Sequence, residues 1–300
     1  MYDLICVGSI SLDLYFSGKS LTSDEERFRL AIGGKYLSDF FHLDIGGGGV
    51  NVAVGVAKHG YKTAVFGKLG DNEFKNILLR KLKEKNVSSE FIQLEKDYYK
   101  ISSILLKENG ERTIIHYETP THLAKEFFLY KDLKKAKNIY FSPLADLSIE
   151  EKTKMIDYLK GDQTLTFVNL SIKDCQQPIE KLEKIFQALD ILILNAHEYA
   201  TLVKKNYHEI DFYHLKLESE ILNDRVVIIT DGEKGSYGYF QGKFYYQKAI
   251  TPKKILDTTG AGDGYTAGFI AQYLQNGDIP SSMKNGAIYA AKILGKIGGN

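Results

Sequence analysis

Several features that would place a protein in a membrane or a secreted class are missing from this sequence. It has two cysteines, Cys6 and Cys175, among 300 residues, so we expect no disulfide framework and predict a cytoplasmic protein. The first residues, MYDLICVGSISLDLYF, show no basic leader or cleavage site, and no apolar run is long enough to cross a bilayer. The net charge is only +1, so we expect neither nucleic acid nor a membrane surface as a partner.

What the sequence does contain is an alternation of short apolar runs with helical patterns. The helical patterns cover 51–60, 73–85 after Asp71, and a stretch that ends at Gly277. The runs are continuous rather than alternating, which is typical of strands covered on both faces. The predicted strands are 4–9, 63–67, 138–142, 165–169, 191–195 and 226–230. This alternation predicts an α/β sandwich with a mainly parallel sheet.

Two segments interrupt this alternation. Residues 102–118 contain two strand-like stretches around Asn109 and Gly110, which is the sequence signal of a tight hairpin. Residues 14–45 form a long insertion that becomes β-compatible near its end. We favour a small separate sheet that covers a site, because long insertions in compact domains are usually functional or disordered. The alternative is an edge hairpin beside a surface loop.

The segment GGGGVNVAVGVAKHG, at 46–60, places four glycines before Asn51 and a helix of small residues. Glycines let backbone NH groups approach a ligand closely, and a helix start adds a partial positive charge. The Asn51 amide can donate and accept, which suits a ligand that carries hydroxyl groups. A flexible turn capped by Asn51 is an equally good interpretation of this segment alone.

Two further segments follow predicted strands. In NAHE, Asn195 and Glu198 have the spacing of a capping box, which requires no ligand. Alternatively, Glu198 reaches a magnesium ion carried by nucleotide phosphates, since such hard cations prefer oxygen ligands. In TDGEKG, the glycine-rich turn and the Thr230 hydroxyl suit either a nucleotide contact or a plain connection between strands.

The segment DTTGAGDGYTAGF, at 257–269, places Asp263 among glycines just before an apolar helix. It lacks the third glycine of the dinucleotide spacing GxGxxG and the Lys-Ser/Thr pair of a P-loop. The free NH groups of Gly260, Ala261 and Gly262 can instead collect negative charge on a phosphoryl group. Asp263 can accept a proton from an attacking alcohol. An aspartate that only caps the helix is the alternative.

Together, in this order and at this spacing, the segments resemble the ribokinase-like, or PfkB-type, carbohydrate kinases. GGGGVN and FGKLGDNEF are similar to the N-terminal signature, DTTGAGDGYTAGF to the C-terminal signature, and NAHE and TDGEKG to the two nucleotide motifs. The resemblance implies a single kinase domain over 1–300: a three-layer α/β/α sandwich with a small β-sheet lid from residues 14–45 and 101–118. It also implies transfer of the terminal phosphoryl group of ATP, with Mg²⁺, to a hydroxyl of a small sugar.

The resemblance also assigns the acceptor side of the site. It implies that Asp263 is the general base and that the backbone of Gly260, Ala261 and Gly262 forms the anion hole. Asp13, in GSISLD, matches the position whose carboxylate holds sugar hydroxyls. The other residues implied to form the sugar floor are Gly46, Gly47 and Asn51.

On the nucleotide side, the resemblance implies that Glu198 helps to organise Mg²⁺, directly or through water. Asp257, Thr259 and Gly298 match positions where some members bind a monovalent cation, which implies activation by K⁺. The residues implied to contact the nucleotide are Asn195, Glu198, Thr230, Gly232, Gly235 and Ala287. Ala287 lies at a position beside the adenine where other members often carry Asn or His, and Asn285 lies two residues earlier.

The chain departs from ribokinases proper in its acceptor site. Phe141 and Ser142 lie near the position where those enzymes carry a glutamate that contacts ribose. Lys173 is the basic residue that could reach a phosphorylated acceptor. A nucleoside kinase and a catalytically silent sugar- or nucleotide-binding regulator therefore stay open as alternatives, whereas the glycine spacing disfavours a nicotinamide oxidoreductase. Exposed edges of a lid sheet predict a homodimer.

Overall fold

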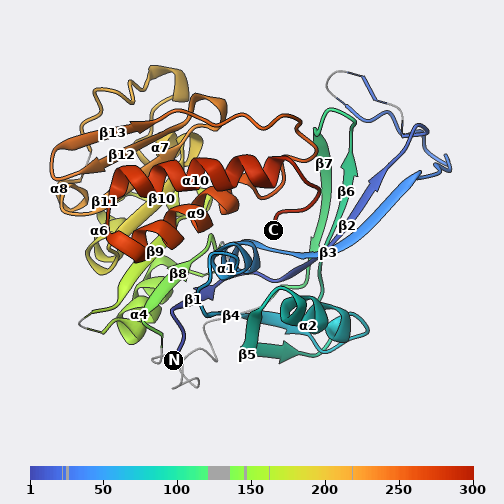
Figure 1. Ribbon diagram of the computed structural model, residues 1–300, viewed down its shortest axis with the longest axis horizontal. Helices are drawn as coiled ribbons and strands as arrows, with labels where there is room; N and C mark the ends of the chain where they lie inside the picture. Colours follow the sequence, from blue (N-terminus) through green and yellow to red (C-terminus); the bar gives the residue numbers. More distant parts are fainter. Residues whose placement is uncertain (22, 25–26, 121–135, 145–146, 162, 218) are drawn as a thin grey trace.

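The computed structural model describes the chain except for residues 22, 25–26, 121–135, 145–146, 162 and 218. The strands of its large sheet are β1 (Leu4–Val7), β4 (Thr63–Gly70), β5 (Val87–Glu95), β8 (Asn138–Phe141), β9 (Leu165–Asn169), β10 (Ile191–Asn195), β11 (Val226–Thr230), β12 (Ser236–Phe240) and β13 (Lys243–Gln247). Their order is β13-β12-β11-β10-β9-β8-β1-β4-β5 (Figure 1). The strands from β11 to β5 are parallel, and β12 and β13 add an antiparallel edge.

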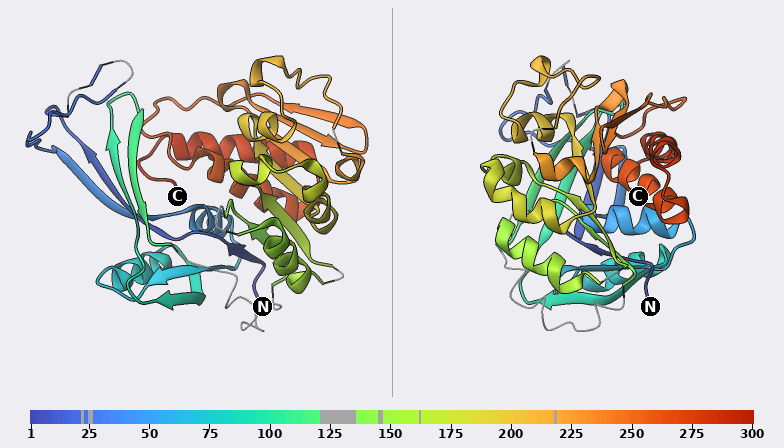
Figure 2. Two further views of the ribbon diagram at one scale, coloured as in Figure 1. Left: turned by 180° about the vertical axis from the view of Figure 1, so that it is seen from behind. Right: turned by 90° about the vertical axis from the view of Figure 1, so that its left-hand side faces the viewer.

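Helices cover both faces of the large sheet (Figure 2). One face carries α1 (Gly48–Ala57), α2 (Lys75–Glu84), α9 (Ala261–Asn276) and α10 (Ile279–Leu294). The other carries α4 (Ile149–Leu159), α6 (Ile179–Ala188), α7 (Ala196–Leu202) and α8 (Glu220–Asn223). Short helical turns are α5 (Ile172–Cys175), η2 (Tyr207–Glu209) and η3 (Gly232–Lys234).

Strand β1 shows why the predicted strands are apolar throughout. Leu4 and Cys6 point into the core cluster on one face, and Ile5 and Val7 point into the cluster on the other. All four side chains are fully buried, as expected for a parallel strand between two helical layers. The predicted three-layer α/β/α sandwich with a mainly parallel sheet is confirmed.

The predicted start of the first helix was wrong. The pattern placed it at 51–60, but α1 begins at Gly48, with Gly47 as N-cap. A β-carbon on Gly49 would lie only 2.8 Å from the Gly8 Cα, so glycine here lets the first turn of α1 pack directly on the backbone after β1. Glycines that look like a loop in sequence are thus partly helical because of this close approach.

The two interrupting segments form one small sheet, consisting of β2 (Ser11–Ser17), β3 (Phe40–Gly46), β6 (Lys100–Leu106) and β7 (Arg112–Glu118). Its order is β3-β2-β6-β7, with β2 and β6 parallel and the two outer pairs antiparallel. The predicted hairpin turn is confirmed, with Gly110 at a φ of 84°. The small sheet projects from one side of the large sheet (Figure 1).

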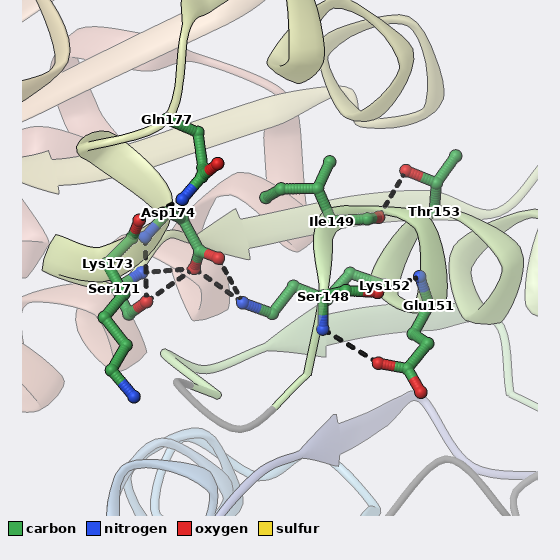
Figure 3. Close-up of polar contacts among 9 residues, drawn as sticks. All are labelled: Ser148, Ile149, Glu151, Lys152, Thr153, Ser171, Lys173, Asp174 and Gln177. Atoms are coloured by element: carbon green, nitrogen blue, oxygen red, sulfur yellow. Dashed lines mark hydrogen bonds and ion pairs between the residues drawn. The ribbon is translucent and has the colours of Figure 1, made fainter.

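A buried ion pair ties α4 to α5 (Figure 3). The Lys152 ammonium donates to both carboxylate oxygens of Asp174 at 2.6 Å, and both side chains are almost fully buried. The Ser171 NH and hydroxyl donate to Asp174 Oδ2 at 2.8 and 2.7 Å. Asp174 therefore completes the capping box of α5, whose N-cap is Ser171, and also neutralises Lys152.

Cys6 and Cys175 are both free and buried. Across the described residues, we find no helix with the length and apolar character needed to span a membrane.

Candidate active site

The loop before α9 presents unpaired backbone NH groups. Gly260 is the N-cap at a φ of 71°, and its carbonyl accepts from the Gly264 NH at 2.8 Å. The NH groups of Ala261, Gly262 and Asp263, in the first turn of α9, have no partner within the helix. Gly262 is exposed, and a β-carbon there would meet nothing within 4 Å. This end of α9 can therefore receive an anion.

Asp263 lies in the same turn and faces α1. Its Oδ2 accepts a hydrogen bond from the Asn51 side-chain nitrogen at 2.8 Å. Burial raises the Asp263 pKa to about 6, the Asn51 hydrogen bond opposes the rise, and the negative charge of Asp13 adds to it. At neutral pH the carboxylate is mostly ionised but basic enough to accept a proton.

The residues predicted to form the sugar floor surround this pair. Asp13, on β2, is buried, and its Oδ1 accepts from the Ser11 hydroxyl at 2.8 Å. Burial is the main cause that raises the Asp13 pKa. A β-carbon on Gly46 would lie 1.9 Å from Asp13 Oδ2, and one on Gly47 would lie 2.3 Å from the Ser9 carbonyl oxygen. Side chains are thus excluded where the floor approaches Asp13.

A cavity of about 670 Å³ opens at the N-terminal end of α9. Ala261 and Gly262 line it, so the anion-binding turn faces the cavity. The predicted nucleotide contacts in its lining are Asn195, Thr230, Gly232, Gly235 and Ala287. The structure thus brings the ends of β10 and β11, the turn before β12 and helix α10 together around one space. Asp263 is outside that lining, on the side of α1.

Asn195 and Glu198 form the capping box that the sequence offered as the first interpretation. The Asn195 side chain accepts from the Glu198 NH, and Glu198 Oε2 accepts from the Asn195 NH, both at 2.8 Å. Burial raises the Glu198 pKa to about 7, and the charge of Asp263 adds to the rise. Glu198 is therefore both a cap and a carboxylate within electrostatic reach of Asp263.

The predicted monovalent-cation position contains a buried carboxylate and a buried hydroxyl. The fully buried Asp257 carboxylate accepts from the Thr259 NH at 2.8 Å and the Gly298 NH at 3.1 Å. The Thr259 hydroxyl is buried and has no hydrogen-bond partner within the described part of the chain. A carboxylate beside an orphaned hydroxyl fits an oxygen-ligated cation.

Three residues considered from the sequence lie elsewhere. Phe141 is buried in the core on the face of α4 and α6. Asn285 donates to the Gly268 carbonyl at 2.7 Å and is not in the cavity lining. Lys173 is exposed and lines a separate hollow with Ser148. The structure thus gives none of them a contact with the cavity.

Sequence reasoning missed two residues at the site, Arg112 and Asn300, and gave a third, Ser142, no role. The buried Ser142 hydroxyl has no partner among the described residues, and its Cβ lies 3.3 Å from a β-carbon built on Gly48. Arg112, on β7, donates to the Thr258 hydroxyl, and Asn300 is buried against Asn51. These last two contacts link segments 146 and 249 residues apart, so no local pattern could predict them.

This large sheet with a projecting small sheet, and an anion-binding helix end beside a carboxylate, define a small-molecule kinase of the ribokinase-like fold. A solved structure with this fold is that of Arabidopsis thaliana ribokinase complexed with ribose and ATP, at a TM-score of 0.74 and 19% identity, covering 99% of this chain and 94% of that chain. The chain belongs to the pfkB family of carbohydrate kinases, since that family's model matches residues 1–300.

Curated relatives in the family differ in the acceptor that their names give. The chain is 31% identical over 246 residues to probable fructokinase-5 of Arabidopsis thaliana, covering 78% of this chain and 75% of the relative. It is 26% identical over 299 residues to a nucleoside kinase of Methanocaldococcus jannaschii, covering 98% of this chain and 91% of the relative. Sugar phosphorylation is supported by the family, and the relatives leave the acceptor open between sugars and nucleosides.

Proposed function

We propose that this carbohydrate kinase moves the terminal phosphoryl group of ATP to a hydroxyl of a small sugar, with Asp263 as general base. The proposal rests on the first turn of α9, which contains both parts of the site. Its Ala261 and Gly262 line the cavity, and its Asp263 carboxylate faces Asn51. Nucleotide and acceptor would thus approach one helix end from opposite sides.

In the proposed reaction, the acceptor lies over Asp13, Gly46, Gly47 and Asn51. Its hydroxyl loses a proton to the Asp263 carboxylate while the oxygen bonds to the phosphorus, and the bond to the ADP oxygen breaks. The NH groups at Gly260, Ala261 and Gly262 hold the charge on the transferring group. The nucleotide would contact Asn195, Thr230, Gly232, Gly235 and Ala287.

Mg²⁺, when bound with the nucleotide, supplies charge neutralisation on the phosphate oxygens. Glu198 is the residue proposed to help hold it, because its carboxylate is half-buried at the end of β10. K⁺ is proposed to bind Asp257, Thr259 and Gly298 beneath the anion hole. Its effect is checked by comparing turnover in K⁺ and in tetramethylammonium buffers.

The general base is tested with Asp263→Asn. We expect turnover to fall roughly a hundredfold to ten-thousandfold, the range for loss of a general base. Binding of ATP and the melting temperature should stay near those of the parent protein, because asparagine keeps the shape and can still contact Asn51. Unchanged turnover would rule out Asp263 as the base.

The acceptor is tested by an ADP-release screen over pentoses, hexoses, sugar phosphates, nucleosides and inositols. A nucleoside kinase is the second candidate, since a curated nucleoside kinase aligns over nearly the entire chain. Absence of ADP release with every acceptor would favour a silent binding protein.

We also propose that residues 1–300 form one cytoplasmic kinase domain in which segments 14–45 and 101–118 act as a lid. Apolar side chains exposed on the small sheet, including Phe41, Ile115 and Tyr117, support a homodimer through it. Hydrogen exchange of the two segments with and without acceptor tests the lid. Sedimentation of the parent protein and Ile115→Lys tests the dimer.

A further inference from the structure

The last residue of a buried tail reaches the candidate active site. Residues 298–300, here called the tail, follow α10 and are all buried. The Asn300 side-chain nitrogen donates to the Ile45 carbonyl at 2.6 Å and to Asn51 Oδ1 at 2.9 Å. The Asn51 nitrogen then donates to Asp263 at 2.8 Å. Three side chains from the tail, α1 and α9 thus form one hydrogen-bonded series.

One backbone carbonyl sets the direction of this series. The Ile45 carbonyl can only accept, so the nitrogen of the Asn300 amide must face it. That nitrogen also meets Asn51, which therefore presents its oxygen to Asn300 and its nitrogen to Asp263. A rotated Asn51 amide would place its oxygen against the Asp263 carboxylate and its nitrogen against the Asn300 nitrogen. Both contacts would then be repulsive.

Packing holds the tail in this place. A β-carbon on Gly299 would lie 2.8 Å from the Asn51 nitrogen, and one on Gly260 would lie 2.4 Å from the Gly299 Cα. The Gly298 NH donates to Asp257 at 3.1 Å. Because the tail contacts both the loop before α9 and the side chain of Asn51, Asn300 has little freedom to move away.

From these contacts we infer that Asn300 is a positioning residue for phosphoryl transfer, which fixes the Asn51 amide in the orientation that donates to Asp263. The inference rests on the proposed role of Asp263 as base. Asn300 has no contact with Asp263 itself and acts through Asn51.

The surroundings of Asp263 make the orientation of Asn51 consequential. The titratable groups within electrostatic reach are Asp13 on β2, Glu198 on α7 and Tyr140 on β8. Burial and the charge of Asp13 disfavour ionisation of Asp263, whereas the Asn51 hydrogen bond favours it. Losing an aligned Asn51 donor would leave burial and the Asp13 charge unopposed.

The test follows the ionisation of Asp263 directly, by ¹³C NMR of labelled aspartate carboxyl groups in the full chain. The Asp263 signal is assigned by its loss in Asp263→Asn. In Asn300→Ala, which removes the donor, and in Asn300→Asp, which replaces it with an acceptor of the same shape, we expect the titration midpoint to rise by about one pH unit. Asn285→Ala, which removes a similar amide-to-carbonyl contact on α10, should leave the midpoint unchanged.

A double variant completes the test. If Asn300 acts through Asn51, Asn51→Ala/Asn300→Ala should titrate like Asn51→Ala alone. An unchanged midpoint in a folded Asn300→Ala overturns the inference, and so does a rise seen only in Asn300→Asp, since its added charge would explain that rise. Should turnover survive in Asp263→Asn, the proposed function fails whatever the midpoints show. If turnover falls in Asp263→Asn while the Asp263 midpoint in Asn300→Ala equals that of the parent protein, only the proposed role of Asn300 fails.

Discussion

Arg112, on edge strand β7 of the small sheet, donates a hydrogen bond to the hydroxyl of Thr258, in the loop that leads to Gly260. The turn before β7 packs against the same segment, since a β-carbon on Gly110 would lie 2.8 Å from Ile255 Cγ2. The small sheet and the loop before α9 are therefore in direct contact.

This contact predicts that Arg112→Gln lowers kcat/KM by roughly tenfold, which corresponds to about 1.4 kcal/mol of transition-state free energy. The reason is that the small sheet loses its contact with the loop that is proposed to hold the transferring group. Steady-state ADP release measures the effect, and hydrogen exchange in β7 should increase in the same variant. Glu111→Gln, an exposed change in the same turn, is the control. Equal kcat/KM values in the two variants would show that the contact between Arg112 and Thr258 does not contribute to turnover.

Glu198 caps α7 and is proposed to help hold Mg²⁺, and one substitution can separate the two roles. In Glu198→Gln the amide oxygen can still accept from the Asn195 NH, so the cap of α7 and the melting temperature should persist. The charge is lost, so we expect the Mg²⁺ concentration for half-maximal turnover to rise several-fold. Asn195→Ala, by contrast, should cost about 1 kcal/mol of unfolding free energy. If Glu198→Gln keeps the Mg²⁺ dependence of the parent protein, Glu198 has only its capping role.

Lys296, next to the tail, predicts a pH dependence of stability. Burial, followed by the charge of Lys58, lowers the Lys296 pKa from 10.5 to about 7 in the folded protein. The unfolded chain therefore binds more protons between about pH 7 and 10.5, and stability should rise with pH across this window. Lys296→Met should raise the melting temperature at pH 7 and flatten the rise. Lys284→Met, an exposed change on α10, should do neither.

The buried pair of Lys152 and Asp174 predicts a non-additive loss of stability (Figure 3). Lys152→Met leaves a buried carboxylate without its cation, which typically costs about 3–5 kcal/mol of unfolding free energy. Adding Asp174→Asn removes that charge while keeping an acceptor for Ser171, so the double variant should be more stable than Lys152→Met. Urea unfolding measures both. Glu150→Gln, an exposed change on the same helix, is the control, and additive losses would contradict the prediction.

Much of the fold could be predicted because it depends on local patterns. The apolar runs of β9, β10 and β11 matched their predicted bounds, since a strand covered on both faces must be apolar throughout. The start of α1 was missed because it depends on Gly49 packing against Gly8, a contact that no window of sequence contains.

Some residues of the candidate site could likewise be predicted from local patterns, and others could not. The segments around Asn51, Asn195, Thr230 and Asp263 carry their own glycines and caps, so their types are visible in sequence. In sequence, Arg112 looks like an ordinary strand residue, and Asn300 looks like an ordinary polar residue after a helix. They gain a place at the site only when the small sheet and the tail close on the loop before α9.

The order of the large sheet also bears on how the protein is made. β1 precedes the other strands of the large sheet in the chain and lies between β4 and β8. During synthesis it therefore gains a neighbour on one side early and on the other only after Asn138–Phe141 has emerged. Until then the growing chain exposes an unpaired edge of a buried, wholly apolar strand, the kind of surface on which incomplete proteins associate. We expect translational pauses or chaperone contacts to matter most before Asn138–Phe141 has emerged.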